Sequence, residues 1–213
     1  MKGKFITLEG IEGSGKSTQI VLLANYLKSV GIPMVLTREP GGTLIGDQVR
    51  KILLDPANTA LDPKTELLLY AASRAQHLKE VIVPHLESPG VVLCDRFADA
   101  TLAYQGYGRR LDIELIRMLD RIVCSGLRPD VTILLDIEAA AGVARARGRN
   151  SVQGLEKEAR FENEAIAFHE RVRQGYLSLA RQEPERIRII EASRSIDEIQ
   201  SEIQKIVSGI VVM

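Results

Sequence analysis

The chain has 213 residues, 45% of them hydrophobic and 26% charged, which is the balance of an ordinary globular protein. Lys plus Arg equals Asp plus Glu at 28 each, so the formal net charge is zero. Because proteins that bind nucleic acids or anionic membranes normally carry a basic excess, neither partner is expected. Two cysteines make no disulfide framework, and no signal peptide or membrane-length apolar run occurs, so we expect a cytoplasmic location.

The first predicted elements are a buried strand over Lys4–Glu9 and a helix that leaves Gly15 and ends near Ser29. Between them the sequence matches G-x-x-x-x-G-K-[ST], a phosphate-binding loop in its required strand–loop–helix setting. Backbone N–H groups of such a loop surround phosphate oxygens, the lysine reaches the β- and γ-phosphates, and the hydroxyl ligates Mg²⁺. The predicted ATP-binding residues are Gly10, Ile11, Glu12, Gly13, Ser14, Gly15, Lys16, Ser17 and Thr18.

Further short apolar runs alternate with amphipathic helical patterns along the rest of the chain. The runs are continuous, which is typical of strands buried on both faces of a sheet. The predicted strands are 34–37, 91–95, 131–136 and 187–191, and the predicted helices are 63–86, 113–125, 138–147, 156–182 and 196–208. This alternation predicts parallel βαβ units in a three-layer α/β P-loop fold with a five-stranded sheet, as one domain over residues 1–213.

Three polar segments follow predicted strands, at the edge where open α/β sheets bind ligands. They are residues 37–43, the Asp95–Arg96–Phe97 turn, and a basic stretch with Arg145, Arg147 and Arg149. An acidic residue that ends a buried strand suits Mg²⁺, and a neighbouring arginine suits a phosphate. Each segment also has a plainer interpretation: Asp95 and Arg96 could form an ion pair, and the basic stretch could be a solvated helix face.

Taken together with the phosphate-binding loop, these segments resemble the thymidylate kinase family over nearly the whole chain. The most specific matches are Arg-Glu-Pro-Gly-Gly-Thr (38–43), Asp-Arg (95–96) and Ala-Tyr-Gln-Gly (103–106). Residues 5–18 and 68–77 also match. The resemblance implies a nucleoside monophosphate kinase-like fold with a short lid at about 142–156, transfer of phosphoryl from ATP to dTMP with Mg²⁺ in dTTP biosynthesis, and a homodimer.

The resemblance also implies roles for residues on the acceptor side. Tyr70 would stack on thymine, and Arg74, one turn along the same helix face, would hydrogen-bond the base. Tyr104 would lie beneath the sugar and exclude a 2′-hydroxyl, with Thr101 and Gln105 at the edge of the ring. Tyr70 replaces the usual Phe of the family, which preserves the aromatic face.

Charged residues are assigned to the two phosphates in the same way. Arg38 and Arg96 would hold the acceptor phosphate, and Glu12 would approach it and the sugar. Ser17 and Asp95 would hold Mg²⁺. The phosphate-binding loop contains no arginine, which resembles the bacterial type in which the lid supplies the catalytic one. The expected catalytic residues are Lys16, Arg96, Arg145, Arg147 and Arg149.

Two other functions stay open on the sequence. The protein could be a kinase for a different nucleoside monophosphate, because the phosphate-binding loop alone does not identify the acceptor. It could also be a P-loop sensor that binds nucleotide without turnover. The polar segment 150–154 is expected to be a loop between two helices that carries the hinge of the lid.

Overall fold

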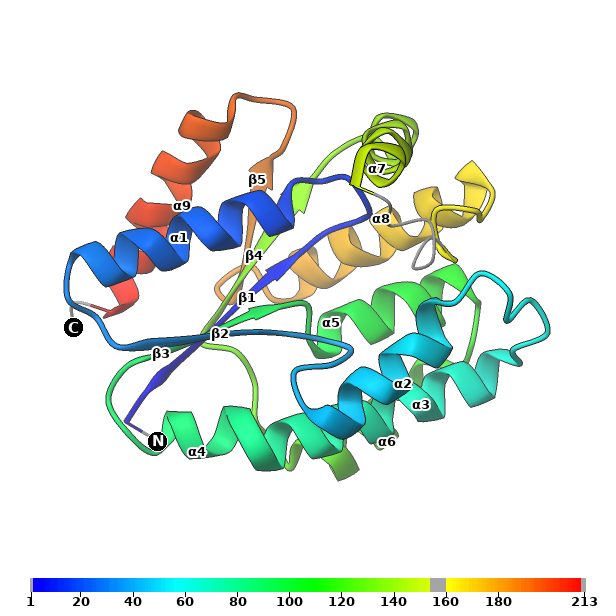
Figure 1. Cartoon of the computed structure of the whole chain (residues 1–213), viewed down its shortest axis with the longest axis horizontal. Coiled ribbons are helices and arrows are strands. Elements are labelled where there is room, and N and C mark those ends of the chain that lie inside the picture. Colours follow the sequence, from blue (N-terminus) through cyan, green and yellow to red (C-terminus); the bar gives the residue numbers. More distant parts are fainter. Residues whose placement is uncertain (1, 154–159, 212–213) are drawn as a thin grey trace.

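The computed structural model describes residues 2–153 and 160–211 and shows a five-stranded parallel sheet with helices on both faces (Figure 1). The spatial order of the strands is β2-β3-β1-β4-β5. The strands are β1 (Lys4–Glu9), β2 (Met34–Arg38), β3 (Val91–Asp95), β4 (Val131–Asp136) and β5 (Ile187–Glu191). The predicted fold class and all five predicted strands are confirmed, with β2 one residue longer than expected.

The three inner strands are buried on both faces, as their continuous apolar sequences predict. Successive side chains of β1 point to opposite faces, so Ile6 and Leu8 pack with one layer of helices and Phe5 with the other. The prediction of burial on both faces is wrong for β2 and β5, where Leu36 and Ile189 are exposed. These strands lie at the two edges of the sheet, and their position there could not be read from composition.

Helices α1 and α9 contact each other on one side of the sheet, while α2, α3 and α6 gather beyond the other side (Figure 1). None of the helices in the described part of the chain is both long and apolar enough to cross a membrane. The α-helices are α1 (Lys16–Ser29), α2 (Leu44–Leu54), α3 (Pro63–His77), α4 (Val83–Leu86), α5 (Ala98–Thr101), α6 (Ile113–Cys124), α7 (Ala139–Gln153), α8 (Ile166–Gln182) and α9 (Ile196–Val211). Two π-helical segments are η1 (Leu78–Ile82) and η2 (Leu102–Gly108).

Several helix boundaries differ from the sequence-based prediction. The helix predicted over 63–86 is a continuous run of α3, η1 and α4, but α2, α5 and η2 were not predicted. The helix predicted over 156–182 begins only at Ile166, because residues 160–165 form turns that place the buried Phe161 against the ring of Tyr104. Residues 156–159 of that prediction lie outside the described part.

The prediction of a loop over 150–154 is also wrong for the residues of that segment that the structure describes. Helix α7 continues through residue 153 instead of ending near Arg147. Residues 150–153 are Asn-Ser-Val-Gln, without proline or glycine, and such residues lower helix propensity by only up to about 0.7 kcal/mol each, so nothing in this stretch forces the helix to end. Gly154 lies outside the described part of the chain.

Asp62 caps the helix that carries the acceptor-side residues, and its removal tests how far local capping stabilises that helix. Its carboxylate accepts hydrogen bonds from the N–H groups of Lys64 and Thr65, at 2.9 and 3.2 Å, and proline follows at the first helical position. Asp62→Ala should lower the free energy of unfolding by about 1 kcal/mol in urea denaturation. Asp62→Asn, which keeps an acceptor oxygen, should retain most of that stability, and equal losses in both variants would contradict the capping role.

Candidate active site

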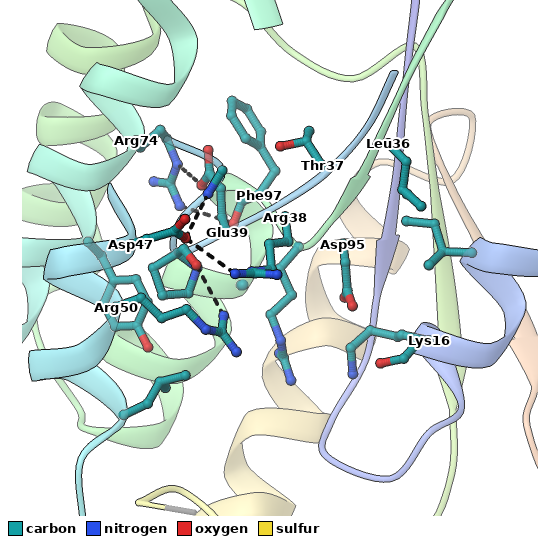
Figure 2. A pocket seen from close by; sticks show the side chains of 18 of the residues that line it. Lys16, Leu36, Thr37, Arg38, Glu39, Asp47, Arg50, Arg74, Asp95 and Phe97 are labelled. Atoms are coloured by element: carbon teal, nitrogen blue, oxygen red, sulfur yellow. Dashed lines mark hydrogen bonds and ion pairs between the residues drawn. The ribbon is translucent and has the colours of Figure 1, made fainter. Parts of the chain in front are cut away.

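A cleft of about 1400 Å³ opens at the carboxyl ends of the parallel strands. Pockets that bind one drug-sized ligand have volumes of roughly 300–1000 Å³, so this larger cleft has room for more than one such ligand. Lys16 and Asp95 lie on one side of it, Asp47, Arg50 and Arg74 lie on the other, and Arg38 lies between them (Figure 2). Parallel strands bring their carboxyl ends to one edge, so segments far apart in sequence meet here.

The phosphate-binding loop joins β1 to the N-terminus of α1. Gly15 caps α1 with φ of 95°, a left-handed conformation that side chains other than glycine rarely adopt. Lys16 is buried and its Nζ donates to the carbonyl oxygens of Gly10 and Ile11 at 3.0 and 2.8 Å. Burial lowers the pKa of Lys16 to about 8, although the carboxylates of Asp95 and Glu12 oppose that shift. The lysine is therefore folded back onto its own loop.

The loop also packs closely on the start of α7. Gly13 has φ of 70°, and a Cβ there would lie 2.0 Å from the carbonyl oxygen of Gly142. A Cβ on Gly142 would lie 2.6 Å from the carbonyl oxygen of Glu12. No side chain fits between these two backbones, so the helix that carries the basic stretch is seated directly on the phosphate-binding loop.

Asp95 ends β3 beside Lys16 and has the features of a cation ligand. Its Oδ1 is buried and accepts no hydrogen bond from any of the described residues. A buried carboxylate oxygen without a donor is costly, and a bound cation would satisfy it. Ser17 is exposed and lines the same cleft. Residues 2–153 and 160–211 contain no cluster of three or more His, Cys, Asp or Glu suited to a metal, but Mg²⁺ needs only one or two protein oxygens when phosphates supply others.

Arg96 is held in an unusual backbone conformation at the centre of the cleft. Its φ of 71° is rare for a residue other than glycine, and such outliers gather at functional sites. Its Nη2 donates to Glu12 Oε1 at 2.9 Å, and its guanidinium lies 4.8 Å from the centroid of the Tyr104 ring. The Tyr104 hydroxyl donates to both oxygens of Glu12 at 2.7 Å. Burial would raise the pKa of Glu12, but Arg96 and the hydrogen-bond donors around it hold that pKa far below its usual range.

The carboxylate of Glu9 stabilises the backbone conformation of Arg96 through contacts with the neighbouring residues. Its Oε1 accepts the backbone N–H of Phe97 at 2.7 Å and its Oε2 accepts the hydroxyl of Tyr176 at 2.6 Å. The same hydroxyl accepts a hydrogen bond from Arg96 Nη1 at 3.3 Å. Glu9 is fully buried, and burial together with the negative charge of Asp99 raises its pKa from 4.5 to about 7.

At the far end of the cleft, Arg74 is held by protein groups on several sides. Its Nε donates to Glu39 Oε2 at 2.8 Å, and both side chains are almost fully buried. Its Nη2 donates to Thr101 Oγ1 at 2.7 Å and to the Phe97 carbonyl at 3.1 Å. Glu39 Oε1 also contacts Nδ1 of His77 at 3.0 Å. The arginine is therefore rigid and presents a fixed edge to the cleft.

Most of the predicted site residues line this one cleft. Tyr70 from α3, Thr101 from α5, and Tyr104 and Gln105 from η2 surround the end where Arg74 lies. Gly10, Ile11 and Ser14 form the body of the phosphate-binding loop but do not line the cleft. The predicted residues that line it are Glu12, Gly13, Gly15, Lys16, Ser17, Thr18, Arg38, Tyr70, Arg74, Asp95, Arg96, Thr101, Tyr104 and Gln105.

The basic stretch on α7 lies beside the cleft rather than in its wall. Arg145 Nη1 donates to the carbonyl of Ala192, which follows β5, at 3.0 Å. Arg147 donates twice to the carbonyl of Glu162, a residue of the cleft wall, at 2.9 and 3.2 Å. Arg149 belongs to α7, and its side chain lies outside the described part. Of the two described arginines, Arg147 is the one directed toward the cleft.

Sequence reasoning missed the groups that support the cleft from behind. Glu39 could have been predicted as a site residue, because it belongs to the Arg-Glu-Pro-Gly-Gly-Thr segment. No local sequence pattern marks the remaining supporting residues. They are Glu9, Glu66, Arg109, Arg160 and Tyr176. Phe161, which lines the cleft and packs against Tyr104, was missed as well.

A phosphate-binding loop with a buried lysine, a strand-end carboxylate and an arginine-rich second compartment define a P-loop kinase that acts on a small phosphorylated acceptor. The sequence model of thymidylate kinase matches residues 8–203. The chain belongs to the thymidylate kinase family.

Individual relatives agree along almost the full length. The chain is 56% identical to the thymidylate kinase of Syntrophotalea carbinolica over 195 residues, which covers 92% of this chain and 90% of that protein. It is 54% identical to the thymidylate kinase of Geobacter sulfurreducens, with 92% of each chain covered. The crystal structure of thymidylate kinase from Ehrlichia chaffeensis superimposes with a TM-score of 0.77 at 36% identity, over 98% of this chain and 99% of that one.

The raised pKa of Glu9 predicts a pH-dependent contribution to stability. Between pH 4.5 and about 7 the folded protein holds a proton on Glu9 that the unfolded chain releases. The contribution of protonated Glu9 to the free energy of unfolding is therefore fully present below pH 4.5 and is lost as the pH rises through 7. Glu9→Gln should therefore become more stable relative to wild type by up to about 3 kcal/mol as the pH rises from 5 to 8.

Urea denaturation at the two pH values measures this difference. Glu185→Gln is the control, because that side chain is 94% exposed and should show no such change. If the free energy of unfolding of wild type minus that of Glu9→Gln is the same at pH 5 and pH 8, Glu9 does not titrate as proposed.

Proposed function

We propose that this protein transfers the γ-phosphoryl group of ATP to dTMP, giving ADP and dTDP. The observation that carries the proposal is a single cleft with the phosphate-binding loop at one end and Tyr70, Arg74, Thr101 and Gln105 at the other. Membership of the thymidylate kinase family supports the same acceptor. An oxygen of the acceptor phosphate forms the new bond to the γ-phosphorus while the bond to the β-phosphate oxygen breaks and leaves ADP.

On the donor side, Lys16 and the backbone N–H groups of the loop hold the ATP phosphates. Lys16, whose Nζ contacts the carbonyl oxygens of Gly10 and Ile11, would donate to the phosphate oxygens from this position in the loop. Ser17 and Asp95 would hold Mg²⁺, which supplies charge neutralisation at the β- and γ-phosphates. The otherwise unsatisfied Oδ1 of Asp95 supports this assignment.

On the acceptor side, Arg38 and Arg96 bind the acceptor phosphate, and Glu12 lies between that phosphate and the sugar. Because Glu12 pairs with Arg96 at 2.9 Å, the acceptor phosphate would share this cation with the carboxylate. Arg38, which is exposed and pairs with Asp47 at 3.3 Å, can turn toward the phosphate at little cost.

The base compartment selects thymine by shape and hydrogen bonding. Tyr70 stacks on the ring, and the rigid edge of Arg74 donates to it. Tyr104, buried and fixed by Glu12, leaves no room for a 2′-hydroxyl beneath the sugar. Thr101 and Gln105 complete the edge of the base compartment.

The chain acts as one kinase domain over residues 1–213, with a lid at about 142–156. A lid that closes over both nucleotides excludes water, which would otherwise accept the phosphoryl group. Of Arg145, Arg147 and Arg149, we assign the catalytic role to Arg147, because its contact with Glu162 directs it toward the cleft.

A homodimer fits the surface of α2, α3 and α6, which lie on the other side of the sheet from α1 and α9 (Figure 1). Ile52 on α2, Leu68 on α3, and Met118 and Ile122 on α6 are large apolar side chains that are 46 to 68% exposed. These helices contact one another, with α3 between α2 and α6, so the exposed side chains can be covered together by a second copy. A cytoplasmic location, where both nucleotides are made, stays a prediction.

A coupled assay of ADP release with a panel of acceptors tests the proposed function. Turnover with dTMP should exceed turnover with dUMP, dCMP, dGMP and AMP, because only thymine satisfies the whole base compartment. Equal rates with a different monophosphate would indicate the alternative of another nucleoside monophosphate kinase. Binding of ATP without turnover with any acceptor would indicate the alternative of a P-loop sensor.

Arginine substitutions on α7 test the assignment of the catalytic cation. Arginines that reach the transferring group in other P-loop enzymes contribute about 10³ to 10⁵ in rate. Arg147→Ala should lower kcat by about 10³ with little change in dTMP affinity, measured by steady-state kinetics and calorimetry. Arg145→Ala is the matched control, because that side chain is bound to Ala192 away from the acceptor. A similar loss in both variants would contradict the assignment.

A further inference from the structure

A buried carboxylate, Glu66, lies behind the base compartment and is bound only by donors. It is 1% exposed and projects from α3, one turn before Tyr70. Its Oε1 accepts Nε2 of Gln105 at 2.8 Å and Nε of Arg109 at 3.2 Å. Its Oε2 accepts from Arg109 and from Arg160. These contacts join α3, η2 and the turn before α8.

The two arginines keep Glu66 ionised. Burial alone would raise the pKa of Glu66, but the hydrogen bonds from Arg109 and Gln105 and the nearby positive charges outweigh burial and lower it. An ionised carboxylate has acceptors only. It therefore distinguishes the two ends of the Gln105 amide, which a hydroxyl or another amide would not do.

The contact with Glu66 fixes which end of the Gln105 amide is free. Gln105 is 1% exposed and lines the cleft beside Thr101 and Tyr104. Its NH₂ group must face Glu66, because the opposite orientation would place two acceptors against each other. Its side-chain oxygen Oε1 accepts no hydrogen bond from the described residues, whereas its backbone carbonyl accepts the N–H of Leu111 at 3.1 Å. The amide therefore has a free acceptor, on the side of Gln105 that Glu66 does not occupy.

The base compartment then carries an ordered pair of hydrogen-bonding groups. Arg74 supplies donors, held in place by Glu39, and Gln105 supplies an acceptor, held in place by Glu66. A 4-oxo pyrimidine presents the complementary pattern, an acceptor at O4 and a donor at N3–H. Cytosine presents the reverse, a donor at the 4-amino group and an acceptor at N3, which would face like groups.

We propose that Glu66 is a positioning residue for base selection. It orients the side-chain amide of Gln105 so that the amide oxygen faces N3–H of a 4-oxo pyrimidine, and cytosine, which lacks that donor, is rejected. This inference rests on the proposed function. Glu66 itself does not contact the substrate; it acts through Gln105. The methyl group of thymine plays no part in this hydrogen-bonding pattern, so discrimination between thymine and uracil must come from other contacts in the base compartment.

Glu66→Gln tests the proposal, because a glutamine at this position has the same size but can donate to the Gln105 carbonyl and allow the amide to turn. The ratio of kcat/KM for dTMP to that for dCMP should fall by about tenfold or more. The ratio for dTMP to dUMP should stay within about twofold, since both bases carry N3–H. Glu66→Asp, which remains an acceptor, should keep the wild-type ratios.

Glu164→Gln is the matched control. Glu164 binds Arg109, as Glu66 does, but makes no contact with Gln105, so both ratios should be those of wild type. A parallel fall of both ratios in Glu66→Gln would show general loosening of the pocket and overturn the proposal. An unchanged dTMP to dCMP ratio in Glu66→Gln would overturn the role of Glu66 but not the proposed function. A wild-type protein without preference for dTMP would overturn both.

A measurement on the wild-type protein covers the case in which Glu66→Gln does not fold. The side-chain amide protons of Gln105, assigned by their disappearance in Gln105→Met, should be protected from hydrogen exchange in the free protein. Their chemical shifts should change little when dTMP binds, because they face Glu66. Unprotected protons, or large shifts on addition of dTMP, would place the NH₂ group against the base and overturn the proposal.

Discussion

The buried contact between Glu9 and the turn after β3 is the constraint on which the active site depends. Glu9 ends the central strand, and its two oxygens hold the Phe97 N–H and the Tyr176 hydroxyl. Between these two contacts Arg96 adopts a left-handed backbone conformation, which places its guanidinium between Glu12 and the ring of Tyr104. Such a conformation persists only where the surroundings over-determine it. One carboxylate thus links β1, β3 and α8 at the point where the two phosphates would meet.

The two ends of the cleft differ in how they are prepared for ligand. At the phosphate-binding loop, Lys16 contacts carbonyl oxygens of its own loop, so its charge is held by weak dipoles that phosphates can replace. At the base end, Arg74 is bound by a full carboxylate and is already rigid. Rigid donors favour discrimination between similar bases, because a base that cannot accept from them leaves them unsatisfied.

Buried or partly buried carboxylates hold three of the polar side chains that would touch substrate, and of these carboxylates Glu12 and Glu39 also line the cleft whereas Glu66 lies behind it. Glu39 holds Arg74, Glu12 holds Arg96, and Glu66 holds Gln105. In every pair one member lies against the cleft and the carboxylate takes up donors that would otherwise be unsatisfied in the protein interior. Preorganisation of this kind reduces the ordering that binding must supply, which improves selectivity without new contacts to the ligand.

The sequence by itself determined the five strands, the phosphate-binding loop and 14 of the residues that line the cleft. These features are local: a continuous apolar run forms a buried strand, and a glycine-rich turn before a helix binds phosphate whatever surrounds it. Only the tertiary structure decided that β2 and β5 are edge strands and that the turn at Phe161 interrupts a helical pattern. It also decided the partners of Arg74 and Gln105, which are 35 and 39 residues away along the chain. Such pairings depend on how separate elements pack, and no local pattern records them.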